Sequence, residues 1–159
     1  MKFLLVIIAL GLLRVEAQEL VLERRADGLW YRSEGKMAYS GKAGRKHFDG
    51  TRVSEINYLE GKQHGLSRFW YPNGNIRSTF NYKDGLLDGN STYYYSNGNI
   101  QNLTYYRNGV KHGWVIDWWP EGKKSFVEGY ANGFPEGVWR SWWPNGKLAS
   151  EKTYRKLRL

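Results

Sequence analysis

Four side chains that could take part in acid–base or metal chemistry recur at a spacing of 24 residues: His64, Asp88, His112 and Glu136. Imidazole and carboxylate groups bind zinc and exchange protons near neutral pH. Each of the four lies in a glycine-flanked bend, and neighbouring bends two strands apart would stand about 10 Å from each other. That distance is too long for one metal ion or a shared proton. We therefore expect these side chains to be solvated turn residues.

No other pattern in the chain is typical of an enzyme. The sequence has no cysteine, and it has neither a nucleophile motif nor a glycine-rich phosphate-binding loop. We predict no catalytic residue, no metal site and no cofactor. The chain is expected to act by binding.

The 24-residue period extends well beyond those four positions. It sets a glycine column and a tyrosine column, both predicted to be structural: Gly74, Gly98, Gly122 and Gly146, with Tyr58, Tyr82, Tyr106, Tyr130 and Tyr154. Internal repetition at this length is typical of a modular array, in which each unit is stabilised by its neighbours. The structure to explain is therefore that of one repeat.

Each repeat contains two turn signals. Segments such as 72–75 join two short runs, and their Asn-Gly pair is predicted to take positive φ at both central positions of a hairpin turn. Segments such as 83–85 are expected to open a five-residue bend that closes at the next glycine. The run before the first turn is aromatic and β-branched, and the run after it ends on the periodic tyrosine. One repeat is therefore predicted to be a β-hairpin plus the turn to its neighbour.

Alternation along each strand predicts which face a side chain occupies. Ile76, Ser78, Phe80 and Tyr82 are expected together on the more apolar face. Aromatic pairs such as Trp118-Trp119 must point to opposite faces. The predicted fold class is all-β, an elongated antiparallel β-sheet built from tandem 24-residue β-hairpins.

The two ends of the chain differ from the array. Residues 1–17 have the basic start, short apolar run and small residues of a secretory signal peptide, with cleavage expected near Ala17. Residues 18–47 keep only parts of the pattern and are predicted to be a degenerate N-terminal capping repeat. Residues 48–154 are the tandem repeats, and residues 155–159 are a basic tail. The protein is therefore expected to be exported, either to the periplasm or into the medium.

The formal net charge is +9 at pH 7. Such a charge attracts acidic proteins, acidic glycans or anionic lipids, and export argues against nucleic acid as a partner. The alternative is that lysine and arginine keep the faces of an aromatic-rich sheet soluble. The basic cluster from Lys152 to Arg158 has two explanations as well. The first is that charge on a final strand discourages end-to-end pairing, and the second is contact with a membrane or an acidic partner. The oligomeric state stays open.

Residues 69–89 show the complete pattern of a repeat: an aromatic pair, an Asn-Gly turn, a strand ending in tyrosine, then Asp-Gly and a second glycine four residues later. This pattern resembles the MORN-repeat variant of bacterial YwqK-family proteins, closely over residues 48–154 and loosely over 27–47. The resemblance implies an elongated antiparallel sheet and a non-enzymatic interaction role. The family is commonly described as antitoxin or immunity components, and no catalytic residues come with it.

The export signal separates this chain from a cytosolic antitoxin and leaves two hypotheses. The first is a protein-binding module, which includes an immunity protein that sequesters an incoming toxin. The second is a module that binds envelope or cell-wall glycan through exposed aromatic and basic side chains. The candidate partner-binding residues lie where the repeats differ from one another or carry charge: Trp114, Trp139, Arg68, Arg140, Lys123 and Lys124. Cross-strand packing is the competing explanation for the aromatic residues.

Overall fold

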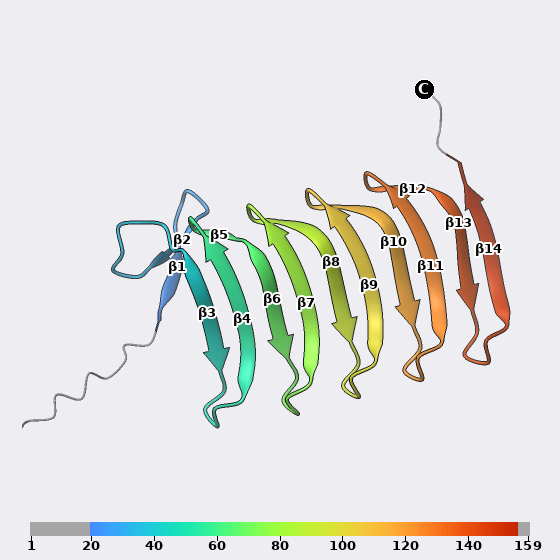
Figure 1. The fold of residues 1–159 in the computed structure, drawn as a ribbon, viewed down its shortest axis with the longest axis horizontal. Helices are drawn as coiled ribbons and strands as arrows, with labels where there is room; N and C mark the ends of the chain where they lie inside the picture. Colours follow the sequence, from blue (N-terminus) through green and yellow to red (C-terminus); the bar gives the residue numbers. More distant parts are fainter. Residues whose placement is uncertain (1–19, 156–159) are drawn as a thin grey trace, which may run out of the picture.

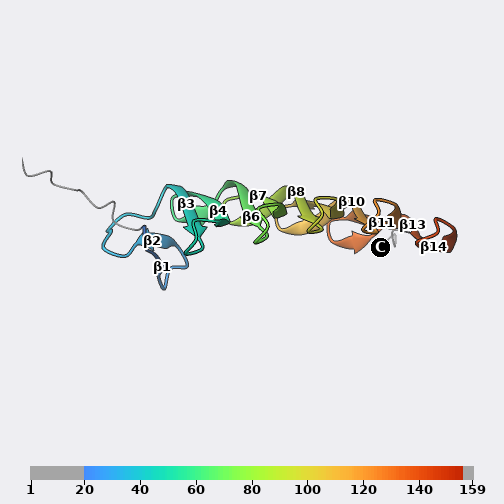
Figure 2. The ribbon, with the colours of Figure 1, turned by 90° about the horizontal axis from the view of Figure 1, so that it is seen from below.

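The protein is one long antiparallel sheet with a small separate hairpin at its N-terminal end (Figure 1). The computed structural model describes residues 20–155, so the predicted signal peptide and residues 156–159 of the basic tail lie outside the described residues. Seen along the plane of the sheet, the array of repeats is a single layer (Figure 2). The prediction of an elongated all-β sheet made of hairpins is confirmed.

Ten strands follow one another across the sheet in chain order, and two short strands extend them. The ten are β3 (Gly41–Lys46), β4 (Arg52–Leu59), β6 (Gly65–Trp70), β7 (Ile76–Lys83), β8 (Leu86–Tyr94), β9 (Ile100–Arg107), β10 (Val110–Trp118), β11 (Lys124–Ala131), β13 (Gly137–Trp142) and β14 (Leu148–Tyr154). The short strands are β5 (Lys62–Gln63), which pairs with β4, and β12 (Phe134–Pro135), which pairs with β11. Residues 20–155 contain no helix long and apolar enough to cross a membrane.

The turns that link one repeat to the next are two-residue hairpin turns. Asp84 and Gly85 both have positive φ, 51° and 86°, and Lys83 pairs directly with Leu86. Positive φ at both central positions is the mark of a type I′ turn. The prediction of a five-residue bend at residues 83–85 is therefore wrong. The strand resumes directly after the two-residue turn, and the next glycine, Gly89, lies within β8.

The Asn-Gly turns at the opposite end of the hairpins have a different geometry. Only Gly74 has positive φ there, so the prediction of positive φ at both positions is wrong. The Gly74 N–H donates to the carbonyl of Tyr71, and the Tyr71 N–H donates to the carbonyl of Asn75. Proline at the first central position favours a type I turn, which leaves the glycine to close the hairpin as a bulge.

A second irregularity changes the face on which β7 begins. Phe69 pairs with Ser78, but its neighbour Trp70 pairs with Ile76, so Arg77 is an extra residue in the ladder. Consecutive residues of β6 point to opposite faces, and their partners on β7 must do the same. The prediction that Ile76 shares a face with Ser78 is therefore wrong, because the bulge reverses the alternation.

Directly paired residues define two faces. The tyrosine face carries Tyr82, Tyr106 and Tyr130, each paired with a glycine of the preceding strand. Beside this row lie small side chains that are almost fully buried, including Ser67, Ser91 and Thr104. Aromatic rings cover them, as where the Phe80 ring lies 5.3 Å from that of Tyr93. Most of the buried side chains of the sheet belong to this face.

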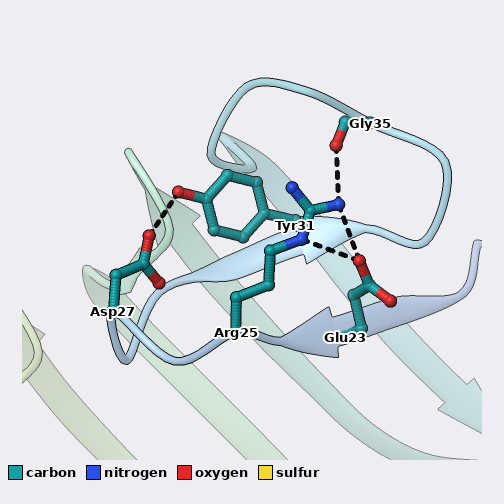
Figure 3. Close-up of polar contacts among 5 residues, drawn as sticks. All are labelled: Glu23, Arg25, Asp27, Tyr31 and Gly35. Atoms are coloured by element: carbon teal, nitrogen blue, oxygen red, sulfur yellow. Dashed lines mark hydrogen bonds and ion pairs between the residues drawn. The ribbon is translucent and has the colours of Figure 1, made fainter.

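The N-terminal hairpin of β1 (Leu22–Arg24) and β2 (Trp30–Arg32) packs against the first tyrosine of the array. The Trp30 ring lies 5.9 Å from that of Tyr58, and the Trp30 N–H donates to the carbonyl of Gly61. A polar network holds this hairpin together: Arg25 binds Glu23 at 2.6 Å and the Gly35 carbonyl at 2.8 Å, while the Tyr31 hydroxyl donates to Asp27 (Figure 3). The hairpin therefore covers a ring that would otherwise be exposed at the end of the sheet.

Candidate binding surface

The row of acid–base side chains is occupied with supporting the turns. His64 Nδ1 accepts the N–H of Asp84 at 3.4 Å, Asp88 Oδ2 accepts that of Asn108 at 3.0 Å, and His112 Nδ1 accepts that of Asn132 at 3.4 Å. The donors are the residues that take positive φ in the next type I′ turn. His64, Asp88 and His112 therefore each satisfy a backbone donor of the following repeat.

The same arrangement reaches further back along the chain than the sequence indicated. Ser40 lies 24 residues before His64, and its hydroxyl accepts the N–H of Glu60 at 2.8 Å. A signal for this contact is present in the sequence, since each acceptor precedes its turn residue by 20 positions. For Glu136 that spacing leads to a position beyond the described residues. Among residues 20–155, no three histidine, aspartate or glutamate side chains lie close enough together to hold a metal ion.

The opposite tips of the hairpins are joined by a second set of bonds between repeats. The Tyr71 hydroxyl donates to the carbonyl of Tyr94 at 2.7 Å, and Tyr95 does the same to Trp118 at 2.7 Å. In the next repeat the indole N–H of Trp119 donates to the carbonyl of Trp142. The outer members of these three aromatic pairs therefore link their hairpin tips to the neighbouring tips. Lys123, one of the candidate binding residues, joins this set, since its Nζ lies 3.3 Å from the Pro144 carbonyl.

The face opposite the tyrosines, called the arginine face here, has an apolar centre between two ion pairs. One row of paired residues crosses it from β4 to β14: Glu55, Arg68, Thr79, Thr92, Leu103, Ile116, Val127, Arg140 and Glu151. Arg68 binds Glu55 at 3.1 Å, and Arg140 binds Glu151 at 2.7 Å. The three aliphatic side chains in the middle are only half-buried. No second layer covers them in the part of the chain that the structure describes (Figure 2).

Two aromatic side chains enlarge this centre. Tyr105 on β9 lies two residues from Leu103, and Trp114 on β10 lies two residues from Ile116, so both belong to the arginine face. The register between β9 and β10 shifts between Lys111 and Val115, and the Tyr105 ring lies 6.4 Å from that of His112. The exposed fractions are 37% for Tyr105 and 57% for Trp114. The Trp114 ring lies beside Gly129, where a Cβ atom would meet it at 3.5 Å. We call the five residues Leu103, Tyr105, Trp114, Ile116 and Val127 the apolar patch.

The candidate binding residues do not gather at one place. Trp139 lies on the tyrosine face between Tyr130 and Tyr154, with ring centroids 5.2 and 4.4 Å away, and its indole N–H donates to the Gly129 carbonyl. Trp114 lies on the arginine face, so no single surface includes both tryptophans. Arg68 and Arg140 share the face of Trp114, and Lys124 pairs with Trp118 at its border. The sequence did not identify Leu103, Ile116 and Val127 as candidates, because aliphatic strand residues are usually core.

The phenols of the tyrosine face have altered acidity. Burial raises the pKa of Tyr58, Tyr82 and Tyr106 above the ordinary value of a phenol. Burial, followed by the carboxylate of Glu128, raises the pKa of Tyr130 to about 12. Protonated, half-buried phenols suit a packing role, and they concentrate on the face without the apolar patch.

Three segments of the chain match the MORN repeat variant: residues 63–84, 87–110 and 135–156. Residues 111–134 form the same hairpin and type I′ turn in the same register, so the array is continuous between the matched segments. No curated protein matches the chain. Over the three matched segments the hairpins are therefore similar to the MORN repeat variant, and repeat arrays generally mediate binding.

Proposed function

We propose that this MORN-repeat protein is a non-enzymatic binding protein that holds another protein against the apolar patch of its arginine face. The observation that carries the proposal is the order of side chains across that face. An apolar centre with an exposed tryptophan and tyrosine is flanked on both sides by arginine–glutamate pairs. Protein interfaces have this composition, with a central cluster of aromatic and aliphatic side chains and a polar rim.

The absence of an enzymatic role is part of the same proposal. His64, Asp88 and His112 each accept a backbone N–H from the following turn, which gives these titratable side chains a structural task. They lie at successive hairpin tips and share no metal-binding geometry within residues 20–155. These contacts support a scaffold that presents a surface rather than a reaction site.

For the biological role, we propose that the exported protein acts as an immunity-type protein that sequesters a toxin. The support comes from the sequence, in the signal-like residues 1–17 and the resemblance to antitoxin-like repeat proteins. The alternative is binding of envelope or wall glycan, which the exposed Trp114 and Tyr105 also favour, because aromatic rings stack on sugars.

The binding proposal is tested by two matched alanine variants. Trp114→Ala removes an exposed aromatic from the arginine face, and Phe126→Ala removes one of similar exposure, 45%, from the tyrosine face. Co-purification from the native host should recover a stoichiometric protein with the wild type and Phe126→Ala, and at least about tenfold less with Trp114→Ala. Equal recovery with both variants would remove the apolar patch from the proposal. Recovery of soluble glycan alone, lost with Trp114→Ala, would support the alternative.

The export proposal has its own measurement. N-terminal sequencing of the protein from the native host should give Gln18 as the first residue, in the extracytoplasmic fraction. A cytoplasmic protein that retains Met1 would contradict export. It would leave the binding proposal unaffected.

A further inference from the structure

A second surface with a distinct chemistry lies at the N-terminal edge of the sheet. β3 is the last strand on this side and pairs only with β4 within the described residues. Five to seven strand spacings of about 4.8 Å separate it from the strands of the apolar patch, so the two surfaces are about 25–35 Å apart. A partner's contact with one of them does not require contact with the other.

The outer edge of β3 has backbone groups available for pairing. The hydroxyl of Tyr39 donates to the Lys42 carbonyl at 2.9 Å, so this carbonyl points away from β4. Backbone direction alternates along a strand, and the N–H and C=O of Gly44 must therefore point outward as well. Gly44 also has no side chain, which leaves room for a second backbone to approach. Such an edge accepts an additional strand.

The side chains around this edge are strongly basic. A hollow of about 650 Å³ runs along β3 and is lined by Lys42, Arg45, Lys46, His47 and Arg52, with Glu55 as its only acidic residue. Glu55 is already bound by Lys42 at 3.2 Å and by Arg68 at 3.1 Å. The positive charge of the hollow is therefore largely uncompensated, and it favours an anionic occupant.

An apolar contact is available at one end of the hollow. Phe48, in the turn after β3, is fully exposed and also lines the hollow. The opposite edge of the sheet, β14, lacks this combination. The two charged residues of β14, Glu151 and Lys152, have opposite signs, and Glu151 is also bound by Arg140. The basic edge is therefore a local property of β3.

We propose that β3 is a docking edge for an extended acidic segment of a partner protein, which adds to the sheet as a further strand. The backbone of the segment pairs with the outward groups around Gly44, its carboxylates face Lys42 and Lys46, and an apolar residue at its end contacts Phe48. A protein segment fits better than a lipid headgroup or a sulfated glycan, because only a peptide supplies amide groups for the open edge. A second copy of this chain fits less well, since a basic β3 would repel another β3.

The test uses a fluorescently labelled peptide of about ten residues in which glutamate and valine alternate, so that one side of the strand is acidic. Its fluorescence anisotropy is followed as the purified protein is added. We expect saturable binding that weakens with added salt, and no binding of the lysine–valine counterpart. The glutamate–valine peptide with N-methyl groups on alternate residues keeps its charge but loses its donors, and it should bind at least about tenfold more weakly.

Two matched charge reversals locate the site. Lys46→Glu on β3 should weaken binding of the acidic peptide by about five- to tenfold, whereas Lys152→Glu on β14 should change it less than about twofold. Both positions are exposed. Circular dichroism spectra and melting temperatures equal to those of the wild type would show that the variants remain folded. Trp114→Ala should bind this peptide like the wild type, so failure at β3 and failure of the apolar patch are distinguishable.

Three results would overturn the proposal. Equal binding of the N-methylated peptide would reduce the site to an anion-attracting surface without strand addition. Binding to phosphatidylserine vesicles in the absence of peptide binding would assign the basic hollow to a membrane. Concentration-dependent self-association that Lys46→Glu abolishes and the acidic peptide does not displace would assign the edge to a second copy.

Discussion

The two faces of this sheet share the same strands and turns, yet they differ in how freely their side chains vary. On the tyrosine face the periodic tyrosines recur with glycines opposite them, and small buried residues fill the space between the rings. On the arginine face, the equivalent positions 55, 79, 103, 127 and 151 read Glu, Thr, Leu, Val and Glu. One face is fixed by what each repeat must pack against. The other face is free to acquire a binding surface, which is where function should be sought.

The largest effect should come from a tryptophan on the fixed face. Trp139→Ala removes a ring packed between Tyr130 and Tyr154 and the indole bond to Gly129. We expect a loss of about 2–3 kcal/mol in the free energy of unfolding, because the side chain is half-buried and its cavity opens in the last repeat. Urea unfolding followed by circular dichroism measures it. A loss no greater than that of Trp114→Ala would erase the distinction between the faces.

A larger side chain, in place of a smaller one, also tests the packing of the tyrosine face. Ser91 is 2% exposed and lies between Phe80 and Thr104, so Ser91→Leu has no space for the added atoms. It should lower the free energy of unfolding by about 1–3 kcal/mol. Ser91→Ala is the control: no described residue hydrogen-bonds the Ser91 hydroxyl, and its removal should be neutral or stabilising by up to about 1 kcal/mol. A tolerated leucine would mean that the rings of this face are loosely packed.

Alkaline pH should destabilise the packing of the tyrosine face before it affects the arginine face. The pKa of Tyr130 is about 12 in the folded protein and has a reference value of 10.0, and burial also raises the pKa of Tyr82 and Tyr106. The unfolded chain therefore loses these protons first, and the free energy of unfolding is retained below pH 10 and falls as the pH rises from about 10 to about 12. Urea midpoints at a series of pH values, with phenolate absorbance, measure this fall.

Tyr130→Phe provides the control for the alkaline fall. It removes the most strongly shifted phenol and should make the loss between pH 10 and 12 shallower. An identical slope in the variant would show that other groups cause the alkaline loss.

The smallest effect on stability should come from the exposed tryptophan. Trp114 is 57% exposed and lies over Gly129, so Trp114→Ala should change the free energy of unfolding by less than about 1 kcal/mol. The same variant should lose its partner. The pair Trp114→Ala and Trp139→Ala therefore separates binding from stability within two neighbouring repeats. A stability loss as large as that of Trp139→Ala would assign Trp114 to packing instead.

The hairpin array follows from the amino-acid sequence alone, because the signals for it are local. Turn glycines and alternating strand residues act on the backbone over a few residues, and the 24-residue period repeats these signals along the chain. The same local signals located the turns but not their types. Asn73-Gly74 lies in a three-residue loop that closes with a glycine bulge, and Asn97-Gly98 does the same with Ser96 in the place of proline, whereas Asp84-Gly85 forms a two-residue type I′ turn.

Which residues share a face, and which of them are free to bind, follows instead from the pairing of strands in the folded sheet. Arg77 enters the ladder as an extra residue and places Ile76 opposite the face that alternation gave it. Trp114 and Trp139 separate, Arg68 and Arg140 gain glutamate partners, and His64 supports a turn 20 residues later. Each of these outcomes depends on the register between strands of different repeats. Register is set jointly by turns, bulges and cross-strand packing, so no single segment of sequence encodes it.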